Sequence, residues 1–344
     1  MEKTDLRDLT FEQTRGICTS LNLPSYRATQ IYTSVFKVDS IDEITTLSKD
    51  LRQKLSENYY IGSLSCQEKQ VSKKDGTIKF LFELIDGNFI ESVFMKYKHG
   101  NTLCVSTQVG CAMGCAFCAS TIGGKVRNLS AAEIIEQIIA AERETGERIS
   151  NVVMMGIGEP LDNFENVIRF LKIVNDEKSL NIGLRHISLS TCGIVPKIYE
   201  LAELGLPVTL SVSLHAPFDD MRSEIMPVNR KYPLGTLVKA MKDYINKTNR
   251  RISIEYSLIQ GKNDTIACAD KLAELFGGGL FHINLIPVNN VRERDFKKTK
   301  AEAVREFQNR LNKKGLNATV RRELGSDIDA ACGQLRKKTQ NIKD

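Results

Sequence analysis

Residues 110–118 read GCAMGCAFC and place Cys111, Cys115 and Cys118 in a Cys-x3-Cys-x2-Cys spacing. Cysteine thiolates bind iron–sulfur clusters, and four thiolates normally satisfy the four irons of a [4Fe-4S] cluster. A short loop with only three cysteines leaves one iron open to a ligand that binds through amino and carboxylate groups. We therefore interpret this loop as the site of a [4Fe-4S] cluster with one open iron.

Two other interpretations of these cysteines are a zinc site with a distant fourth ligand and thiols that only fill the core. Zinc sites favour two Cys-x2-Cys pairs or added histidines. The chain has four histidines, and none is spaced as a metal-binding motif: His99, His186, His215 and His282. The cysteine spacing therefore favours the cluster.

The chain around this loop alternates strand-like and helix-like segments, which is typical of βα units and a parallel sheet. The strand candidates are residues 102–107, 151–157, 186–191, 208–214, 252–259, 281–288 and 317–324. Ser130 and Glu133 form a capping box before an apolar run, and Phe164, Val167, Ile168 and Leu171 share one helix face. Six or seven units predict an α/β fold, a partial (β/α)6 TIM-type barrel. Its chemistry should gather at the carboxyl ends of the strands.

The N-terminal third has a different pattern. Helical segments are expected at 10–21, 26–36 and 41–59, which gives a small helical accessory domain over residues 1–60. Asp-Gly pairs at 75–76 and 86–87 separate strand-like runs and predict a β-hairpin extension over residues 61–96. We expect the barrel core over residues 97–325, followed by a C-terminal segment over 326–344.

Bulk composition narrows the class of protein. The 344 residues are 42% hydrophobic and contain no apolar run long enough for a membrane span, and the first residues lack the apolar run of a signal peptide. We therefore expect a cytoplasmic monomer without a membrane partner. Nine cysteines in that compartment indicate metal-binding, catalytic or core thiols more than disulfides.

The formal charge of +6 is compatible with a polyanionic partner without establishing one. Basic residues cluster late in the chain, at residues 250–251, 292–300, 313–314, 321–322 and 336–338. Such clusters are candidates for phosphate contacts, although most basic runs are only solvated faces.

Several strings together carry a resemblance to a known family. They are TLCVSTQVGCAMGCAFCAS (102–120), KVRNLSAAEI (125–134), VVMMGIGEPLDN (152–163), SVSLHAP (211–217), INLIPVN (283–289) and GSDIDAACGQL (325–335). The loop spacing resembles the radical S-adenosylmethionine superfamily. The surrounding strings resemble its dual-specificity RNA methyltransferases, the RlmN family, which methylate carbon 2 of adenine. The resemblance runs from Gly87 to Leu335.

The resemblance implies a mechanism with two further cysteines. Carbon 2 of adenine has no nucleophilic lone pair, so its methylation requires a radical route. The family uses two S-adenosylmethionine molecules per turnover: one methylates the cysteine matching Cys332, and the other is cleaved at the cluster to activate that methyl group. Cys104 matches the cysteine that forms a transient disulfide with Cys332, and Glu91 matches the proton acceptor. Without the resemblance, Cys104 and Cys332 would be interpreted as core cysteines and Glu91 as a strand-face carboxylate.

The resemblance also implies a set of cofactor contacts at strand ends. The matching residues are Gly158, Glu159, Ser190, Ser213, Leu214, His215 and Asn289. By itself, the GIGEP string at 156–160 would fit a simple turn. Cys18, Cys66, Cys192 and Cys268 have no matching role and are expected to be structural.

The substrates implied by the resemblance are an adenosine in 23S rRNA at the peptidyl transferase centre and the adenosine 3′ of the anticodon in certain tRNAs. An electron donor such as flavodoxin or ferredoxin would feed the cluster. One alternative is the sister branch that methylates carbon 8 of the same rRNA adenosine; Pro160 favours the carbon-2 branch, because the sister branch tends to have Ala there. A second alternative is a non-catalytic iron–sulfur or zinc redox protein.

Overall fold

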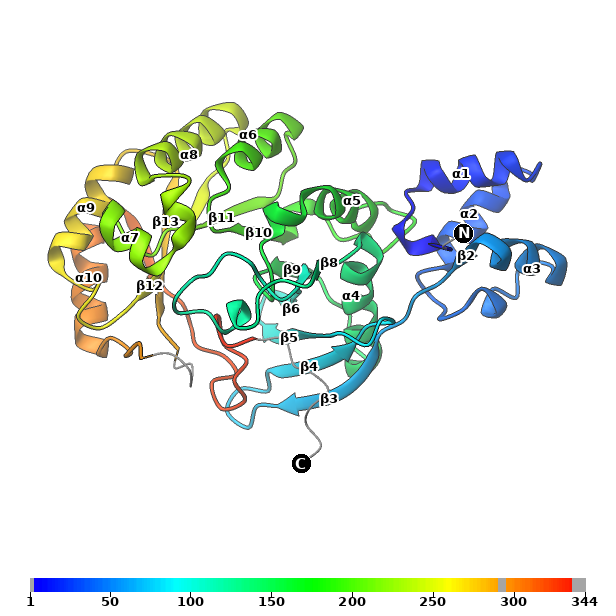
Figure 1. The fold of residues 1–344 in the computed structure, drawn as a ribbon, viewed down its shortest axis with the longest axis horizontal. Coiled ribbons are helices and arrows are strands. Elements are labelled where there is room, and N and C mark those ends of the chain that lie inside the picture. The colour runs from blue at the N-terminus through cyan, green and yellow to red at the C-terminus, as the bar shows by residue number, and fades with distance from the viewer. Residues whose placement is uncertain (1–2, 290–294, 336–344) are drawn as a thin grey trace.

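The computed structural model describes residues 3–289 and 295–335. Figure 1 shows a small helical lobe at the N-terminus beside a larger curved α/β unit. Two of the late basic segments fall partly or wholly outside the described residues, namely 292–294 within 292–300 and all of 336–338. Within the described residues, no helix is both long enough and apolar enough to span a bilayer.

The N-terminal lobe contains three helices, α1 (Phe11–Ser20), α2 (Tyr26–Ser34) and α3 (Lys49–Asn58), and a short parallel pair of strands, β1 (Thr4–Asp5) and β2 (Tyr59–Tyr60). The third predicted helix, 41–59, is shorter than expected. Only a 3-10 turn, η2 (Ile41–Glu43), forms at its start, and α3 begins after Ser48, whose hydroxyl accepts a hydrogen bond from Leu51 N. The N-cap side chain therefore sets the true start of the helix.

A ten-stranded sheet forms the centre of the larger unit. Its strands, in spatial order, are β14 (Asn317–Val320), β13 (Phe281–Pro287), β12 (Ile252–Leu258), β11 (Thr209–Ser213), β10 (Ile187–Thr191), β9 (Asn151–Met154), β6 (Gly100–Cys104), β5 (Phe89–Tyr97), β4 (Ile78–Glu83) and β3 (Ser65–Val71). The seven strands from β6 to β14 are parallel, and β3 to β6 are antiparallel. The partial barrel and its hairpin extension are therefore confirmed.

Helices cover the outer side of the parallel strands (Figure 1). They are α4 (Ala131–Thr145), α5 (Phe164–Val174), α6 (Val195–Leu204), α8 (Leu234–Thr248), α9 (Ile266–Phe276) and α10 (Ala301–Lys313). The short α7 (Asp219–Ile225) lies instead at the strand ends, where its Ile225 O accepts a hydrogen bond from Ala116 N at 2.9 Å. The capping box of Ser130 and Glu133 is confirmed at the start of α4. The predicted apolar face of α5 is also buried against the sheet. The hydrophobic core forms where the apolar face of each helix packs against the sheet.

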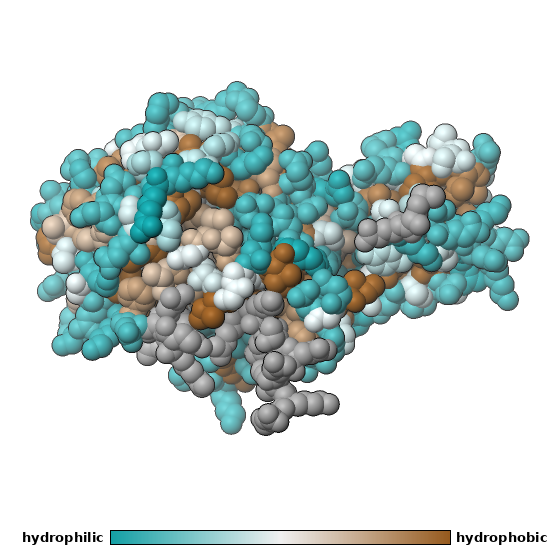
Figure 2. Space-filling model, viewed as in Figure 1, coloured by the Kyte–Doolittle hydropathy of each residue, from teal (hydrophilic) through white to brown (hydrophobic). Residues whose placement is uncertain are grey.

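Two loops approach each other at the inner side of the barrel. The three-cysteine loop (residues 110–124) follows β6 and a small antiparallel pair flanks it, β7 (Gln108–Val109) and β8 (Arg127–Asn128). The Cys332 loop (residues 321–335) follows β14 and folds back toward the hairpin of β3 and β4 (Figure 1). Figure 2 shows hydrophilic side chains over most of the outer surface, with apolar side chains exposed near the centre of this face.

Candidate active site

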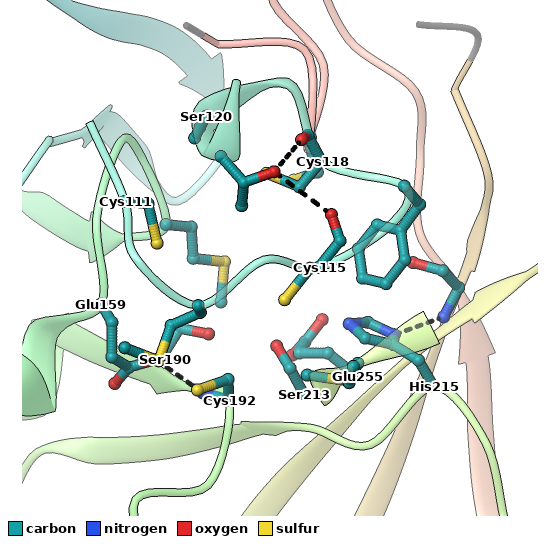
Figure 3. Close-up of a pocket in the computed structure, with 18 of the residues that line it drawn as sticks. Cys111, Cys115, Cys118, Ser120, Glu159, Ser190, Cys192, Ser213, His215 and Glu255 are labelled. Atoms are coloured by element: carbon teal, nitrogen blue, oxygen red, sulfur yellow. Dashed lines mark hydrogen bonds between the residues drawn. The ribbon is translucent and has the colours of Figure 1, made fainter. Parts of the chain in front are cut away.

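A cavity lies where the parallel strands end, between the three-cysteine loop and the Cys332 loop (Figure 3). Carboxyl ends of barrel strands are the usual place for chemistry in this architecture. Ten of the thirteen predicted site residues line the cavity: Cys111, Cys115, Cys118, Gly158, Glu159, Ser190, Ser213, His215, Asn289 and Cys332. The other three, Cys104, Glu91 and Leu214, are buried beside it.

The three-cysteine loop is ordered by its own hydrogen bonds. Cys118 N donates to Cys115 O at 3.2 Å, and the Thr121 hydroxyl donates to Cys118 O at 2.9 Å (Figure 3). Gly110, with φ of +74°, begins the loop, and a Cβ there would lie 1.9 Å from Gly124 O. Only glycine permits that close crossing of the two ends of the loop.

The thiols of this loop suit metal binding. Burial raises the pKa of Cys111 to about 12, and burial followed by the neighbouring Cys118 raises the pKa of Cys115. A bound metal supplies the positive charge that turns such thiols into thiolates. Within residues 3–289 and 295–335, no three His, Cys, Asp or Glu side chains converge as ligands of a single ion. A cluster gives each thiolate its own iron, so convergence on one point is not required, and the three thiols fit a [4Fe-4S] group.

The glycine-rich segment after β9 is packed tightly against the strand before the three-cysteine loop. Gly156 N donates to Val105 O at 3.1 Å, and a Cβ at Gly156 would lie 2.6 Å from that oxygen. Gly158 has φ of +110°, and a Cβ there would lie 2.7 Å from Gln108 Cβ. The main chain of this segment therefore packs closely against residues 105–108 at the cavity wall, which a simple surface turn would not do.

Glu159 is buried with its carboxylate fixed by main-chain donors. Oε1 accepts from Leu161 N at 3.0 Å, and Oε2 accepts from Cys192 N at 2.7 Å. Burial raises the pKa of Glu159, and these hydrogen bonds oppose that rise. The side chain thereby joins the end of β9 to the end of β10 at the cavity edge (Figure 3).

His215 is held as a neutral imidazole. Its Nδ1 accepts a hydrogen bond from Ser257 N at 2.9 Å, and its ring meets Phe117 edge-on at 4.7 Å between centroids. Burial, with a smaller effect of Arg222, lowers the pKa of His215 to about 3. Because Nδ1 is an acceptor, the proton lies on Nε2, so the ring offers the cavity a neutral N–H donor.

Arg222 is a site residue that sequence reasoning missed. It is fully buried on α7, and its guanidinium donates to the carbonyl oxygens of Cys192 (2.7 Å), Ser213 (3.2 Å) and Leu214 (3.1 Å). These contacts hold the ends of β10 and β11 together. Leu214 itself points into the core, so only its main chain can serve the site. One arginine in a polar helix carries no sequence signal for burial.

The Cys332 loop is bound directly to the three-cysteine loop. Ala119 N donates to Gly333 O at 2.8 Å, and the Ser120 hydroxyl donates to Leu335 O at 2.6 Å. The Asn289 side chain donates to Cys332 O at 3.0 Å. The predicted methyl-carrying cysteine and the predicted cluster ligands are therefore brought to one cavity, although Cys332 and Cys111 are far apart in sequence.

Cys104 lies at the end of β6, beneath the Cys332 loop. It packs with Val93, Leu324, Ala330 and Leu335. Burial, followed by the neighbouring Cys332, raises the pKa of Cys104 to about 12. All nine cysteines lie in the described residues, and none is in a disulfide bond. The structure therefore brings the Cys104 thiol to the underside of the loop that carries Cys332.

Glu91, the predicted proton acceptor, does not contribute to the cavity lining. It is buried on β5, where its carboxylate lies 3.7 Å from Lys79 Nζ. Lys79 Nζ also donates to Asp329 O of the Cys332 loop at 3.3 Å. Arg321, which the sequence predicted only as a candidate phosphate contact in the basic pair 321–322, lines the cavity, with Nη1 3.5 Å from Met155 Sδ.

Comparisons with known proteins agree with this geometry. The radical SAM superfamily model matches residues 105–275, and the ribosomal RNA large subunit methyltransferase N-terminal domain matches residues 4–61. A relative from Alkaliphilus oremlandii, named "Probable dual-specificity RNA methyltransferase RlmN", is 54% identical over 339 residues, covering 98% of this chain and 99% of the relative. The chain belongs to the RlmN family. The family prediction made from the cysteine spacing and the surrounding strings is confirmed.

Two more relatives extend the match over nearly the whole chain. A Thermoanaerobacter sp. (strain X514) protein with the same RlmN name is 53% identical over 336 residues, covering 97% of this chain and 98% of the relative. The crystal structure of a radical SAM methyltransferase from Sphaerobacter thermophilus is 43% identical, with a TM-score of 0.91, and covers 96% of this chain and 99% of that one. Membership of the radical SAM superfamily implies a [4Fe-4S] cluster and S-adenosylmethionine.

Proposed function

We propose that this protein methylates carbon 2 of an adenine in folded RNA, by way of a methyl group carried on Cys332. One observation carries the proposal: the hydrogen-bonded contact between the three-cysteine loop and the Cys332 loop, which makes Cys332 line the same cavity as Cys111, Cys115 and Cys118. A metal-only role would leave unexplained the buried Cys104 thiol next to the Cys332 loop and the glycine-rich segment at the cavity wall.

The chain's own residues divide the work. A [4Fe-4S] cluster on the three cysteines, with bound S-adenosylmethionine, supplies radical chemistry when an electron arrives. Cys332 accepts a methyl group from one S-adenosylmethionine, and a second molecule is consumed in each turnover. The predicted cofactor contacts would hold that molecule against the glycine-rich segment, with His215 as a neutral donor and Glu159 as a fixed acceptor.

Release of the product needs a second thiol. We assign this step to Cys104, whose thiolate attacks the Cys332 sulfur. A disulfide forms as the bond from that sulfur to the transferred carbon breaks. The electron pair of that bond passes to the carbon, which takes up a proton to become the methyl group, and a dithiol reductant must reopen the disulfide before the next turnover. The packing of Cys104 under the Cys332 loop supports the assignment. The high pKa of Cys104 means that its proton must be removed during this step.

Glu91 is proposed as the acceptor of the proton from carbon 2. The contact of 3.7 Å with Lys79 Nζ orients the Glu91 carboxylate on β5. Because Glu91 is buried next to Lys79, which binds the Cys332 loop, we propose that the loop shifts when RNA enters.

The proposed substrates are adenosine 2503 of 23S rRNA, or its equivalent, and adenosine 37 of tRNA. Each base must leave its stack to enter the cavity, at a cost of roughly a few kcal/mol. Exposed basic residues such as Arg322 and Lys313 are candidates for phosphate contacts. An electron donor such as flavodoxin or ferredoxin is proposed, and the cytoplasmic location and monomeric state stay predictions.

Nucleoside analysis tests this function. The protein is purified without oxygen, its cluster is rebuilt, and it is incubated with an rRNA fragment or tRNA, S-adenosylmethionine and a reductant. Mass spectrometry of the digested RNA should find 2-methyladenosine with the wild type and none with Cys332→Ala. Cys66→Ala, a cysteine on β3 outside the site, is the matched control and should keep activity. The appearance of 8-methyladenosine would favour the sister branch, and no methylated base would favour a redox protein.

A further inference from the structure

The turn between β3 and β4 (residues 72–77) is in direct contact with the Cys332 loop, about 250 residues later in the chain. The Ser72 hydroxyl donates to Asp327 Oδ1 at 2.7 Å, and Lys73 N donates to Asp327 Oδ2 at 3.0 Å. In the other direction, Gly325 N donates to Asp75 Oδ2 at 3.0 Å. The turn therefore supplies the Asp75 carboxylate, which accepts a hydrogen bond from the Cys332 loop, and the loop supplies the Asp327 carboxylate, which accepts hydrogen bonds from the turn.

The turn is shaped so that both carboxylates keep their places. Asp75 Oδ1 accepts from Thr77 N at 2.9 Å, which fixes the side chain while Oδ2 faces Gly325. The Ser72 hydroxyl also accepts from Lys74 N at 3.2 Å. Each of the two carboxylate oxygens of Asp75 therefore accepts a hydrogen bond from a different main-chain N–H group.

Glycine at 325 is required for the contact. Its φ is +63°, and a Cβ there would lie 2.7 Å from Ala330 Cβ and 3.0 Å from Thr77 Cγ2. The same glycine closes a compact turn, because Ala330 N donates to Gly325 O at 3.1 Å. The hairpin turn and the loop therefore meet in a packed joint in addition to their hydrogen bonds.

The joint is one of two anchors of the segment that carries Cys332. Two residues separate Asp329, whose carbonyl accepts from Lys79 Nζ, from Cys332. Beyond Cys332, Gly333 and Leu335 are held by the three-cysteine loop. The thiol therefore lies between an anchor on the hairpin and an anchor on the three-cysteine loop.

We propose that Asp75 and Asp327 are positioning residues: they form a latch that docks the Cys332 loop on the hairpin turn and holds the Cys332 thiol over Cys104. The proposal rests on the proposed function of Cys332. The hydrogen bond from Ser72 holds the pKa of Asp327 below its ordinary value, as expected for a carboxylate that is bound in its charged form. The β-hairpin extension thereby gains a role in the reaction.

The variants Asp327→Asn and Asp75→Asn test the latch. Each carboxylate uses both oxygens as acceptors, so an amide must turn an NH2 group toward a donor. Loss of a hydrogen bond to a charged group should raise the undocked fraction roughly tenfold. Hydrogen exchange of the peptide 323–335, measured by mass spectrometry on the full-length holoenzyme, should accelerate by the same factor. Asp86→Asn, in the Asp-Gly turn at the other end of the same hairpin, is the matched control and should leave this exchange unchanged.

The rate of disulfide formation between Cys104 and Cys332 tests the positioning role. Under a mild thiol oxidant, formation of the Cys104–Cys332 disulfide should slow roughly tenfold in both latch variants. Asp86→Asn should match the wild type. Ser72→Ala removes the hydroxyl that donates to Asp327 and accepts from Lys74 N, and it leaves both carboxylates in place. It is a milder variant in case an Asp→Asn chain fails to fold, and it should show a smaller change in the same direction.

Two results would overturn the latch. Unchanged exchange in all three variants would show that the hydrogen bonds do not hold the loop. Faster exchange with an unchanged disulfide rate and unchanged RNA methylation would show that docking does not position Cys332. Neither result touches the proposed function, which is tested separately by the methylated nucleoside that the wild type forms and by the activity of Cys332→Ala.

Discussion

The side-chain amide of Asn289 donates a hydrogen bond to the main-chain carbonyl oxygen of Cys332 at 3.0 Å. Asn289 follows the end of β13, and Cys332 lies 43 residues later in the chain. The sequence resemblance assigns Asn289 to cofactor binding, whereas the structure gives its amide a partner in the loop of the predicted methyl carrier. A single side chain therefore joins the strand ends of the barrel to the Cys332 loop.

Asn289→Ala should loosen the Cys332 loop. A neutral hydrogen bond contributes about 1 kcal/mol, so hydrogen exchange of the peptide 323–335 should accelerate about fivefold. The control is Asn58→Ala, because Asn58 is exposed on α3. Asn263→Ala is unsuitable, since the Asn263 amide donates a hydrogen bond to His215 O. If Asn289→Ala changes only the KM for S-adenosylmethionine and leaves exchange unchanged, its main partner is the cofactor.

Much of the barrel could be predicted from apolar runs. All seven strand candidates form parallel strands. Inner strands such as β12 and β13 are mostly buried and mostly apolar, a pattern that is visible in the sequence, whereas β14 at the sheet edge has one buried residue. The start of α4 was equally visible, since Ser130 and Glu133 are local partners. Features made by neighbours in sequence are the ones that sequence reasoning recovers.

The rest depended on contacts between distant segments. Arg222 is buried because its guanidinium donates to three carbonyl oxygens at the ends of β10 and β11. These acceptors lie 8 to 30 residues before Arg222 in the chain, so the residue pattern of α7 did not indicate them. Glu91 matched the family string, but its partner Lys79 and the loop above both come from elsewhere in the chain. The latch of Asp75 and Asp327 joins segments about 250 residues apart, so a turn signal at Asp75-Gly76 gave no hint of it.

Gly158→Ala should destabilise the protein. At φ of +110° an alanine is strained, and its Cβ would lie 2.7 Å from Gln108 Cβ. Strain and overpacking together should lower the free energy of unfolding by about 2 to 5 kcal/mol, measured by urea denaturation. Gly235→Ala in α8 meets nothing within 4 Å and should not destabilise. Equal behaviour of the two variants would mean that the close approach at Gly158 is relaxed in solution.

Arg7 connects the N-terminal lobe to the barrel. Its guanidinium is fully buried, pairs with Glu136 of α4, and donates to the carbonyl oxygens of Val35 and Gly62. Arg7→Met leaves the buried Glu136 carboxylate with only the partly exposed Arg143 as a cationic partner and should cost about 3 kcal/mol in unfolding free energy. Arg15→Met, from an exposed pair with Glu12, should cost less than about 1 kcal/mol. A small loss at Arg7 would show that the lobe is not held by this pair.

His215 predicts a pH dependence of stability. Its pKa is lowered to about 3 by burial, whereas an unfolded histidine titrates near 6.5, so between these values the unfolded chain binds more protons. Stability should therefore be complete above pH 6.5 and fall by up to about 1.4 kcal/mol per unit as the pH drops toward 3. His215→Gln should flatten this part of the curve in urea titrations of the apoprotein. An identical slope in the variant would place the titrating group elsewhere.

Cys104→Ala gives the sharpest test of the two-cysteine mechanism. Without Cys104, no thiolate can attack the Cys332 sulfur, so the adduct between protein and RNA should persist. Denaturing gels of the reconstituted enzyme with labelled RNA should show a covalent band that depends on S-adenosylmethionine. The double variant Cys104→Ala/Cys332→Ala should lose that band, and Cys66→Ala should turn over freely without accumulating it. Cys104 sits beneath the loop with Leu324 and Leu335, so alanine leaves only a small cavity and the fold should persist. Free turnover of Cys104→Ala would remove this thiol from the mechanism, because the RNA would then be released without a disulfide between Cys104 and Cys332.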